Sequence, residues 1–123
     1  MQTISTLHAP QAIGPYSQGK IVGEFIFTSG QIALTPSGEF IDGDIVAQTR
    51  QVLENLSAIL KEADSSLAKV VKTNVFLADM GDFGAMNEIY AEYFGDNKPA
   101  RSTVAVKTLP KNAKVEIECI AIR

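Results

Sequence analysis

The sequence predicts an α+β fold, in which one mixed six-stranded sheet carries two helices on one of its faces. Short runs of β-branched and aromatic residues, divided by Gly, Pro, Ser and Asn turns, recur along the chain and predict strands. Two longer stretches instead repeat their apolar residues every three or four positions, as amphipathic helices do. The resulting order is β-β-β-α-β-α-β-β, without repeats or linkers, so residues 1–123 are expected to form a single domain with its own core.

The first three strands are expected after an irregular start that is rich in Pro and Gly. In KIVGEFIFTSG (20–30), two apolar runs are interrupted at Gly23 and Glu24, which predicts a hairpin that ends at Gly30. The next stretch, LTPSGEFI (34–41), contains a Pro-Ser-Gly turn. We expect a third strand piece on either side of this turn.

Two amphipathic helices follow in the predicted order. The first begins after Asp42 or Asp44, either of which suits the N-cap position, and continues for about five turns to Ala63. The second follows DMGD (79–82) and is ended by Gly95. Its apolar stripe consists of Phe83, Met86, Ile89, Tyr90, Tyr93 and Phe94.

Three further strands are expected, over residues 67–79, 101–109 and 113–123. The first of these is too apolar and too rich in β-branched residues for a surface strand, so we expect it in the centre of the sheet. The last is apolar on both faces, since Ile120 and Ile122 lie on the face opposite Val115 and Ile117. Helices on one face leave the other uncovered, so we expect self-association in which the open faces of several subunits pack together.

Composition argues against several classes of function. The net charge is −3, the pI is about 5.1, and the eleven Lys and Arg residues are scattered, which argues against a nucleic-acid partner. One cysteine and one histidine provide neither an internal disulfide nor a protein metal site. No apolar run approaches the roughly 20 residues of a membrane span, and the polar N-terminal stretch does not resemble a secretory signal. We therefore expect a cytoplasmic protein without a membrane partner.

Arg101 and Glu118 are the residues for which the sequence most strongly indicates a functional role. Glu118 shares its strand face with Ile120 and Ile122, so a buried carboxylate there needs a partner or a raised pKa. We expect Arg101, at the start of the preceding strand, to lie near it across an antiparallel pair. Spacing alone slightly favours a structural ion pair at a subunit interface. The alternative is a polar pocket in which Arg101 binds a substrate carboxylate and Glu118 orients a water molecule.

Other residues are weaker candidates for a binding site. Tyr16 follows a turn and its ring suits a pocket wall, while the backbone at Ser29 and Gly30 allows a ligand to approach closely. Phe83 and Asn87 are one helical turn apart, and a capping or interface hydrogen bond is the simpler interpretation of Asn87.

The remaining reactive side chains do not form a catalytic set. Cys119 is expected to be buried and unreactive, and His8 to be solvated in the leader. No Ser/His/Asp set is present, so nucleophilic catalysis is disfavoured.

Five segments together resemble the RidA family, which is also called the YjgF family. They are IGPYSQG (13–19), FTSGQIALTPSGE (27–39), NVFLADMGDFGAMNEIYAEYF (74–94), KPARSTVAV (98–106) and LPKNAKVEIECIA (109–121). The resemblance implies a chorismate-mutase-like fold and a homotrimer with a central barrel and three ligand sites between subunits. It also implies hydrolysis of 2-aminoacrylate and 2-aminocrotonate to 2-oxo acids and ammonia, without a cofactor or a metal.

The resemblance also implies roles for individual residues. Arg101 takes the place of the carboxylate-binding arginine and Glu118 that of the water-directing glutamate. The substrate-binding positions fall on Tyr16, Ser29, Gly30, Phe83 and Asn87. Thr103 stands where many relatives have cysteine, which removes any thiol-dependent role there.

Two alternatives to a hydrolase remain open. A non-catalytic regulatory protein that senses a small carboxylate, a 2-oxo acid or an amino acid, needs Arg101 but not Glu118. Ribonuclease or translation-inhibitor activity, described for some relatives, is disfavoured by the acidic pI and the absence of a histidine acid/base pair.

Overall fold

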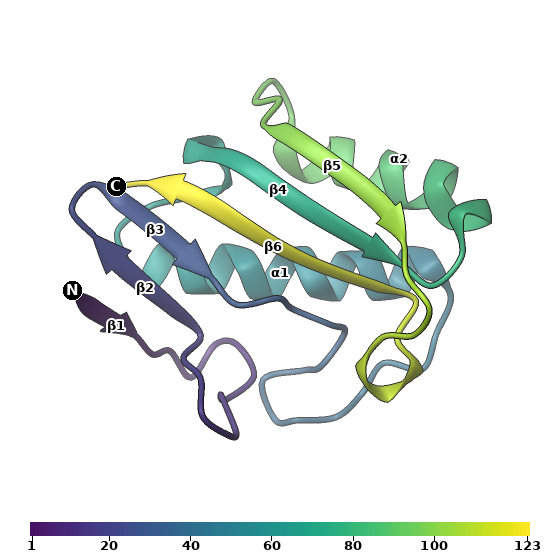
Figure 1. The fold of residues 1–123 in the computed structure, drawn as a ribbon, viewed down its shortest axis with the longest axis horizontal. Helices are drawn as coiled ribbons and strands as arrows, with labels where there is room; N and C mark the ends of the chain where they lie inside the picture. The colour runs from purple at the N-terminus through teal and green to yellow at the C-terminus, as the bar shows by residue number, and fades with distance from the viewer.

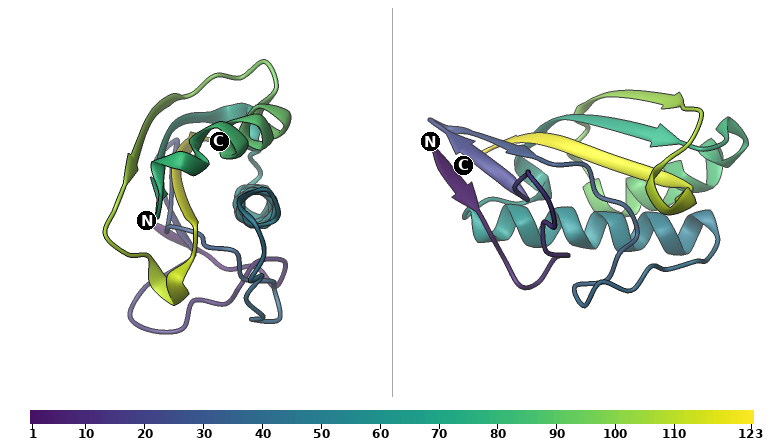
Figure 2. Two further views of the ribbon diagram at one scale, coloured as in Figure 1. Left: turned by 90° about the vertical axis from the view of Figure 1, so that its right-hand side faces the viewer. Right: turned by 60° about the horizontal axis from the view of Figure 1, so that its bottom comes forward.

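The computed structural model describes residues 1–123 and contains a mixed six-stranded sheet in the order β1-β2-β3-β6-β4-β5. The strands are β1 Gln2–Ile4, β2 Gly19–Val22, β3 Phe25–Thr28, β4 Val70–Leu77, β5 Ala100–Ala105 and β6 Val115–Ile122. Both helices lie on the same side of this sheet (Figures 1 and 2). The predicted fold class is therefore confirmed.

The two helices have the predicted positions and ends. Helix α1 spans Ile45–Glu62, and the Asp44 side chain caps it by accepting a hydrogen bond of 2.8 Å from the Ala47 N–H. Helix α2 spans Phe83–Phe94 and ends at Gly95, whose φ of 59° is the left-handed conformation that favours glycine. Short 3₁₀ turns lie at Leu67–Lys69, Met80–Asp82 and Pro110–Asn112. Neither α1 nor α2 is both long and apolar enough to pass through a membrane.

The core lies between the helices and the sheet. Leu53, Leu56 and Ile59 of α1 are fully buried, as are Val75 of β4 and Ile117 of β6. Complete burial of a side chain of this kind stabilises the fold by about 1.5–3 kcal/mol. The apolar positions that recur every three or four residues in the sequence therefore fix α1 on the sheet.

The prediction of a third strand piece on either side of the turn in residues 34–41 is wrong. Residues 34–41 form a turn with only an isolated bridge between Leu34 and Phe40. The Thr35 hydroxyl accepts the Glu39 N–H within this segment, so the polar turn is stabilised by its own side chains and does not extend into the sheet. The sixth strand is instead β1, which the polar sequence QTI did not indicate.

The expected antiparallel pairing of β5 with β6 is also wrong. Strand β5 pairs with β4, in parallel, because the connection between them is helix α2. Strand β4 then separates β5 from β6, as Figure 1 shows. In this register Arg101 is level with buried Thr73, whereas Glu118 is level with Asn74, its neighbour in β4. Arg101 and Glu118 therefore lie two strand spacings apart, about 10 Å, and point to opposite faces of the sheet.

Candidate active site

Arg101 projects from β5 onto one side of helix α2 and is held there by three residues of that helix. Its Nη1 donates a hydrogen bond of 2.7 Å to Asn87 Oδ1. The guanidinium carbon lies 4.7 Å from the centre of the Tyr90 ring and 5.5 Å from that of Phe83. Phe83, Asn87 and Tyr90 recur every three or four residues, so they share one side of the helix. We call these four residues the arginine region.

Tyr90 fixes the geometry of the arginine region. Its hydroxyl forms a hydrogen bond of 2.8 Å with the Thr73 hydroxyl, and the centre of its ring lies 4.4 Å from that of Phe94. Burial raises the pKa of Tyr90, so the phenol stays neutral beside the guanidinium. The position of the Tyr90 ring is therefore fixed before any ligand binds. The ring in turn fixes where the Arg101 guanidinium lies over it.

The guanidinium of Arg101 has no carboxylate partner in the chain. The one ion pair of the structure joins Arg50 and Glu92, both of which are solvent-exposed. A cavity of about 400 Å³ adjoins Arg101, and its lining includes Lys98 but no acidic residue. A half-buried arginine with free N–H donors and no acid nearby is suited to a carboxylate ligand, which it can bind through two parallel hydrogen bonds.

A second group of predicted site residues lies at the other side of the molecule. Tyr16, Ser29 and Gly30 line a cavity of about 590 Å³ together with Glu116 and Lys111. We call Tyr16, Ser29, Gly30 and Glu116 the carboxylate region. Tyr16 is 56% exposed although it is an aromatic residue at a cavity mouth, which indicates a position that a ligand or another subunit covers.

The backbone at Ser29 and Gly30 is held on both sides. The Ser29 N–H donates to the Gln18 carbonyl at 2.9 Å, and the Ser29 hydroxyl donates to the Ser17 carbonyl. One residue further on, Gln31 exchanges two backbone hydrogen bonds with Ile117 of β6. The segment after β3 is therefore anchored to the N-terminal leader and to the strand that carries Glu116.

Glu116 is a candidate site residue that the sequence analysis did not single out. A Cβ atom at Gly30 would overlap its carboxylate, so the absence of a side chain at Gly30 creates the space that Glu116 occupies. Burial raises the pKa of Glu116, and the negative charge of Glu118 raises it further. A carboxyl group of this kind gains and loses its proton closer to neutral pH than an ordinary glutamate does.

Glu118 lies outside the carboxylate region. It accepts a hydrogen bond of 3.0 Å from Asn74 Nδ2 and lines a separate cavity of about 130 Å³ with Lys72 and Phe27. Two glutamates at alternate positions of one strand look equivalent in the sequence. The signal that distinguishes them is Gly30, which lies next to Glu116 and not next to Glu118.

The arginine region and the carboxylate region do not meet within one chain. Glu116 is level with Phe76 and Phe76 with Val104, so Glu116 is two strands away from β5 and three residues along it from Arg101. Two strand spacings and three residue rises separate their Cα atoms by roughly 14 Å, with side chains on opposite faces. Of the predicted site residues, the structure thus brings Phe83 and Asn87 to Arg101, and Tyr16, Ser29 and Gly30 to Glu116.

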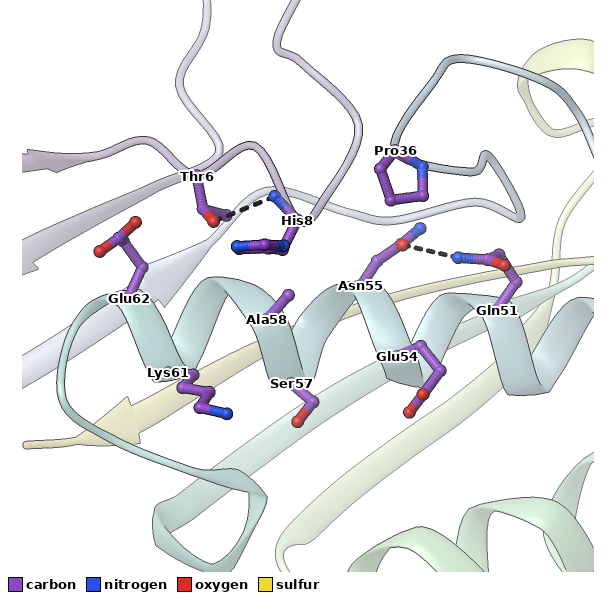
Figure 3. Close-up of a pocket in the computed structure, with 10 residues that line it drawn as sticks. All are labelled: Thr6, His8, Pro36, Gln51, Glu54, Asn55, Ser57, Ala58, Lys61 and Glu62. Atoms are coloured by element: carbon purple, nitrogen blue, oxygen red, sulfur yellow. Dashed lines mark hydrogen bonds between the residues drawn. The ribbon is translucent and has the colours of Figure 1, made fainter.

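The groove on the outer surface of α1 contains none of these residues (Figure 3). It has a volume of about 690 Å³ and includes His8, Glu54 and Lys61, all solvent-exposed and of mixed charge. Asn55, which lines the groove, donates hydrogen bonds to the carbonyl groups of Ile32 and Leu34 and so fixes the loop that follows β3. Asn55 therefore has a structural use in this groove.

The remaining nucleophile and metal candidates can be placed as well. Cys119 is buried as predicted, and burial raises its pKa to about 12, so its thiol remains protonated and unreactive. Histidine, cysteine and acidic side chains do not gather anywhere in groups of three or more that suit a metal ion.

Comparison with known proteins identifies the family. Residues 6–123 match the family described as Endoribonuclease L-PSP. The chain belongs to this family. It is the RidA family that the sequence motifs resemble, so that resemblance is confirmed.

Relatives of the RidA family match over nearly the whole chain. The RutC family protein of Pyrococcus horikoshii is 54% identical over 123 residues, covering 99% of this chain and 98% of that protein. The human 2-iminobutanoate/2-iminopropanoate deaminase is 47% identical, covering 99% of this chain and 90% of that protein. The crystal structure of E. coli TdcF with bound serine has a TM-score of 0.96 at 44% identity, covering 100% of this chain and 99% of that one.

Proposed function

We propose that this protein hydrolyses 2-enamine and 2-imine carboxylates, among them 2-aminoacrylate and 2-aminocrotonate, to 2-oxo acids and ammonia. The observation that carries the proposal is Arg101, whose guanidinium is oriented by Asn87 and two aromatic rings and has no acid partner. Relatives named as imine deaminases at about half identity support it, as does a related structure with bound serine, a small amino carboxylate. We place the reaction in the cytoplasm, and no cofactor enters it.

The complete site is proposed to lie between subunits. The arginine region of one copy faces the carboxylate region of the next, which places Arg101 and Glu116 on the same ligand. A homotrimer with three such clefts is the assembly that we propose. The high exposure of Ile13, 86%, and of Tyr16, 56%, at the mouth of the carboxylate region supports a neighbour at this place.

Arg101 binds the substrate in this proposal. Its free N–H groups pair with the substrate carboxylate, and the rings of Phe83 and Tyr90 keep the guanidinium plane fixed. Asn87 holds Nη1 of Arg101 in place, so the remaining N–H donors meet the substrate carboxylate in a single arrangement. Binding therefore places the planar enamine or imine in one orientation, and positioning of this kind lowers the barrier to reaction.

Glu116 takes the water-directing role in place of Glu118. The enamine first takes up a proton from solvent water at its terminal carbon, which gives an iminium carbon that is open to attack. Glu116, ionised at this stage, accepts a proton from a water molecule as the water oxygen bonds to that carbon. The carbinolamine passes a proton to nitrogen and the C–N bond breaks, which releases ammonia and leaves the 2-oxo acid. A raised pKa makes Glu116 a stronger base for this step, and the proton it takes then passes to solvent, which balances the proton added at carbon.

The experiment generates 2-aminoacrylate with a serine dehydratase, intercepts it with semicarbazide and follows pyruvate formation. We expect the protein to accelerate pyruvate formation, and expect both Arg101→Ala and Glu116→Gln to lose the acceleration. Glu118→Gln serves as the matched variant, since it removes the same charge two residues away on the same strand face. All variants are assayed at protein concentrations at which they are assembled. If Glu118→Gln then loses the activity and Glu116→Gln keeps it, the water-directing role belongs to Glu118, as the family resemblance implies.

A different outcome supports the regulatory alternative. A correctly assembled wild-type protein that binds 2-oxobutanoate through Arg101 but accelerates no hydrolysis is a sensor and not an enzyme. Isothermal titration with 2-oxobutanoate, on wild type and on Arg101→Ala, measures this binding, and the pyruvate assay on the same samples then separates the two cases.

A further inference from the structure

A loop of residues 5–18 joins β1 to β2 (Figure 1) and is here called the leader. It forms one wall of the cavity that contains Glu116, through Pro10, Gln11, Ile13 and Tyr16. Within the leader, the only backbone hydrogen bond of good geometry runs from the Tyr16 N–H to the Gly14 carbonyl, at 2.9 Å. A loop with so few backbone hydrogen bonds of its own needs side chains to satisfy its polar groups and fix its course.

The side chain of Gln18 supplies the hydrogen bonds that the leader backbone lacks. Its Oε1 accepts the Thr6 N–H at 2.7 Å, and its Nε2 donates to the carbonyl groups of Thr6, at 3.1 Å, and Pro10, at 2.8 Å. The Ala9 carbonyl lies 3.4 Å from the same nitrogen. Gln18 is only 2% exposed, so water does not replace its amide when the amide is lost.

No other side chain holds the leader in this way. Gln11 Nε2 also donates to the Thr6 carbonyl, at 3.1 Å, but Gln11 is solvent-exposed and water can take its place. The Thr6 hydroxyl accepts the His8 N–H, which fixes only two adjacent turns of the chain. The course of the leader therefore depends on Gln18.

The backbone of Gln18 holds a second wall of the same cavity. Its carbonyl accepts the Ser29 N–H at 2.9 Å, while the Ser29 hydroxyl donates to the carbonyl of the preceding residue, Ser17. Ser29 comes directly before Gly30, which leaves the space for Glu116. One buried residue thus joins the leader to the segment that borders the carboxylate.

We propose that Gln18 is a positioning residue of the site, which keeps Tyr16 and the backbone at Ser29 and Gly30 at fixed places around Glu116. The inference rests on the proposed function and adds to it a residue that acts through the backbone groups it holds. Reacting groups that are held in place before the ligand binds need no rearrangement during the reaction.

The leader also limits the access of water to Glu116. Burial is the larger cause of the raised pKa of Glu116, and the negative charge of Glu118 is the other. The remaining titratable side chains at this cavity are those of Lys111, in the loop before β6, and Tyr16. When the amide of Gln18 is removed, the leader loosens and water reaches the carboxylate, so the pKa of Glu116 falls toward that of an ordinary glutamate.

The test is Gln18→Met, which fills a similar space without an amide. We expect kcat for 2-aminoacrylate hydrolysis to fall roughly 10-fold or more, since a misplacement of about 1 Å can lower a rate about 100-fold. KM should change much less, because Arg101 binds the substrate carboxylate. The acid limb of the pH profile of kcat should move to lower pH with the pKa of Glu116. A loss of folded protein alone lowers kcat at every pH and leaves this limb in place.

Hydrogen–deuterium exchange tests the anchor without any substrate. The Thr6 amide lies outside the strands, yet it should exchange slowly in wild type because it is bonded to the buried Gln18 side chain. In Gln18→Met its exchange should be about 10-fold faster, since loss of a buried hydrogen bond shifts the local opening equilibrium by roughly this factor. The amides of β4, in the centre of the sheet, serve as the internal reference.

Gln48→Met is the matched control. Gln48 is 1% exposed, accepts the Lys114 N–H at 2.8 Å and lies outside the cavity that contains Glu116. The same substitution there removes a buried amide and should lower the stability, while the acid limb and the exchange of the leader remain as in wild type. If Gln18→Met does not fold, Gln18→Asn, whose amide is one methylene shorter, replaces it with the same expected results.

Two results overturn the inference. One is a folded Gln18 variant that keeps the kcat and the acid limb of wild type. The other is unchanged exchange at Thr6, which means that the Gln18 amide does not hold the leader. A wild type without deaminase activity refutes the proposed function alone, and the exchange at Thr6 then decides whether Gln18 anchors the leader.

Discussion

Gly30 gives the sharpest test of the carboxylate region, through the substitution Gly30→Ala. The backbone of Gly30 does not have a positive φ, so alanine is accepted there without backbone strain. The added Cβ overlaps a Glu116 carboxylate oxygen and lies 2.9 Å from Cδ and 3.1 Å from Cγ of the same side chain. All three close contacts are with Glu116, so the glutamate must move and the rest of the structure need not.

The magnitudes follow from this geometry. Glu116 can leave the contact by rotating its side chain, which costs about 0.5–1.5 kcal/mol if the new position is off a rotamer. A displacement of about 1 Å in a group that positions the attacking water lowers the rate about 100-fold. We therefore expect kcat for 2-aminoacrylate hydrolysis to fall about 100-fold while the free energy of unfolding changes by about 1 kcal/mol.

The assay for Gly30→Ala combines pyruvate formation with thermal unfolding. Gly84→Ala is the matched control, since a Cβ at Gly84 meets nothing within 4 Å, and alanine in helix α2 should stabilise it slightly. In a Glu116→Gln background the further loss caused by Gly30→Ala should be small, because both substitutions act on one carboxylate. Full activity of Gly30→Ala, or equal losses in both backgrounds, refutes the role given to this contact.

Four further predictions concern single side chains. Because the pKa of Glu116 is raised, the acid limb of the pH profile of kcat should lie at a higher pH than the pKa of an ordinary glutamate. For the same reason Glu116→Gln should raise Tm near neutral pH, where the folded state holds an unfavourable charge at Glu116, but not in acid, where Glu116 is protonated in both the folded and the unfolded state. Asn87→Ala should raise KM about 10-fold through loss of the hydrogen bond to Arg101, and Asn87→Asp should raise KM further because its carboxylate competes with the substrate, as steady-state kinetics will show. Asp44→Ala should cost about 1 kcal/mol of stability in chemical denaturation, with kcat unchanged. Thr103→Val should stabilise the protein by about 1 kcal/mol in the same measurement, since the Thr103 hydroxyl is buried without a partner.

The sequence predicts those parts of the fold that repeat with a fixed period. The spacing of Val52, Leu56 and Ile59 and the cap at Asp44 define α1 to within a residue of its observed start. The order of the strands in the sheet cannot be predicted in this way, because no local sequence pattern indicates which neighbour a strand pairs with. The placement of β5 beside β4 follows from the parallel connection through α2, and missing it led to the expected contact between Arg101 and Glu118.

The candidate residues named from the sequence fall into two groups in the structure, and the sequence did not indicate this grouping. Arg101 with Phe83 and Asn87 forms one region, and Tyr16 with Ser29 and Gly30 forms another. A resemblance assigns positions one at a time and does not state which of them share a subunit. That division becomes visible only when the strand register places the two regions on opposite faces.

Glu116 and Glu118 show how environment separates chemically identical groups. They occupy the same face of the same strand, two residues apart, and the charge of Glu118 adds to the effect of burial in raising the pKa of Glu116. The Asn74 amide donates a hydrogen bond to Glu118, whereas no hydrogen bond joins Glu116 to a protein group in the space left by Gly30. Glu116 is therefore suited to exchange a proton at the cavity of Tyr16.

In the proposed site there is a physical reason for Arg101 not to lie beside Glu116 in the same chain. An arginine in direct contact with Glu116 would lower the pKa of that carboxyl and form an ion pair that competes with the substrate carboxylate. Placing Arg101 on the opposite face of the sheet, against α2, keeps its N–H donors free in the separate chain. A ligand carboxylate is then the group that can bind between the two when copies associate. In the proposed reaction, separation of the two regions within one chain thus keeps both of them available.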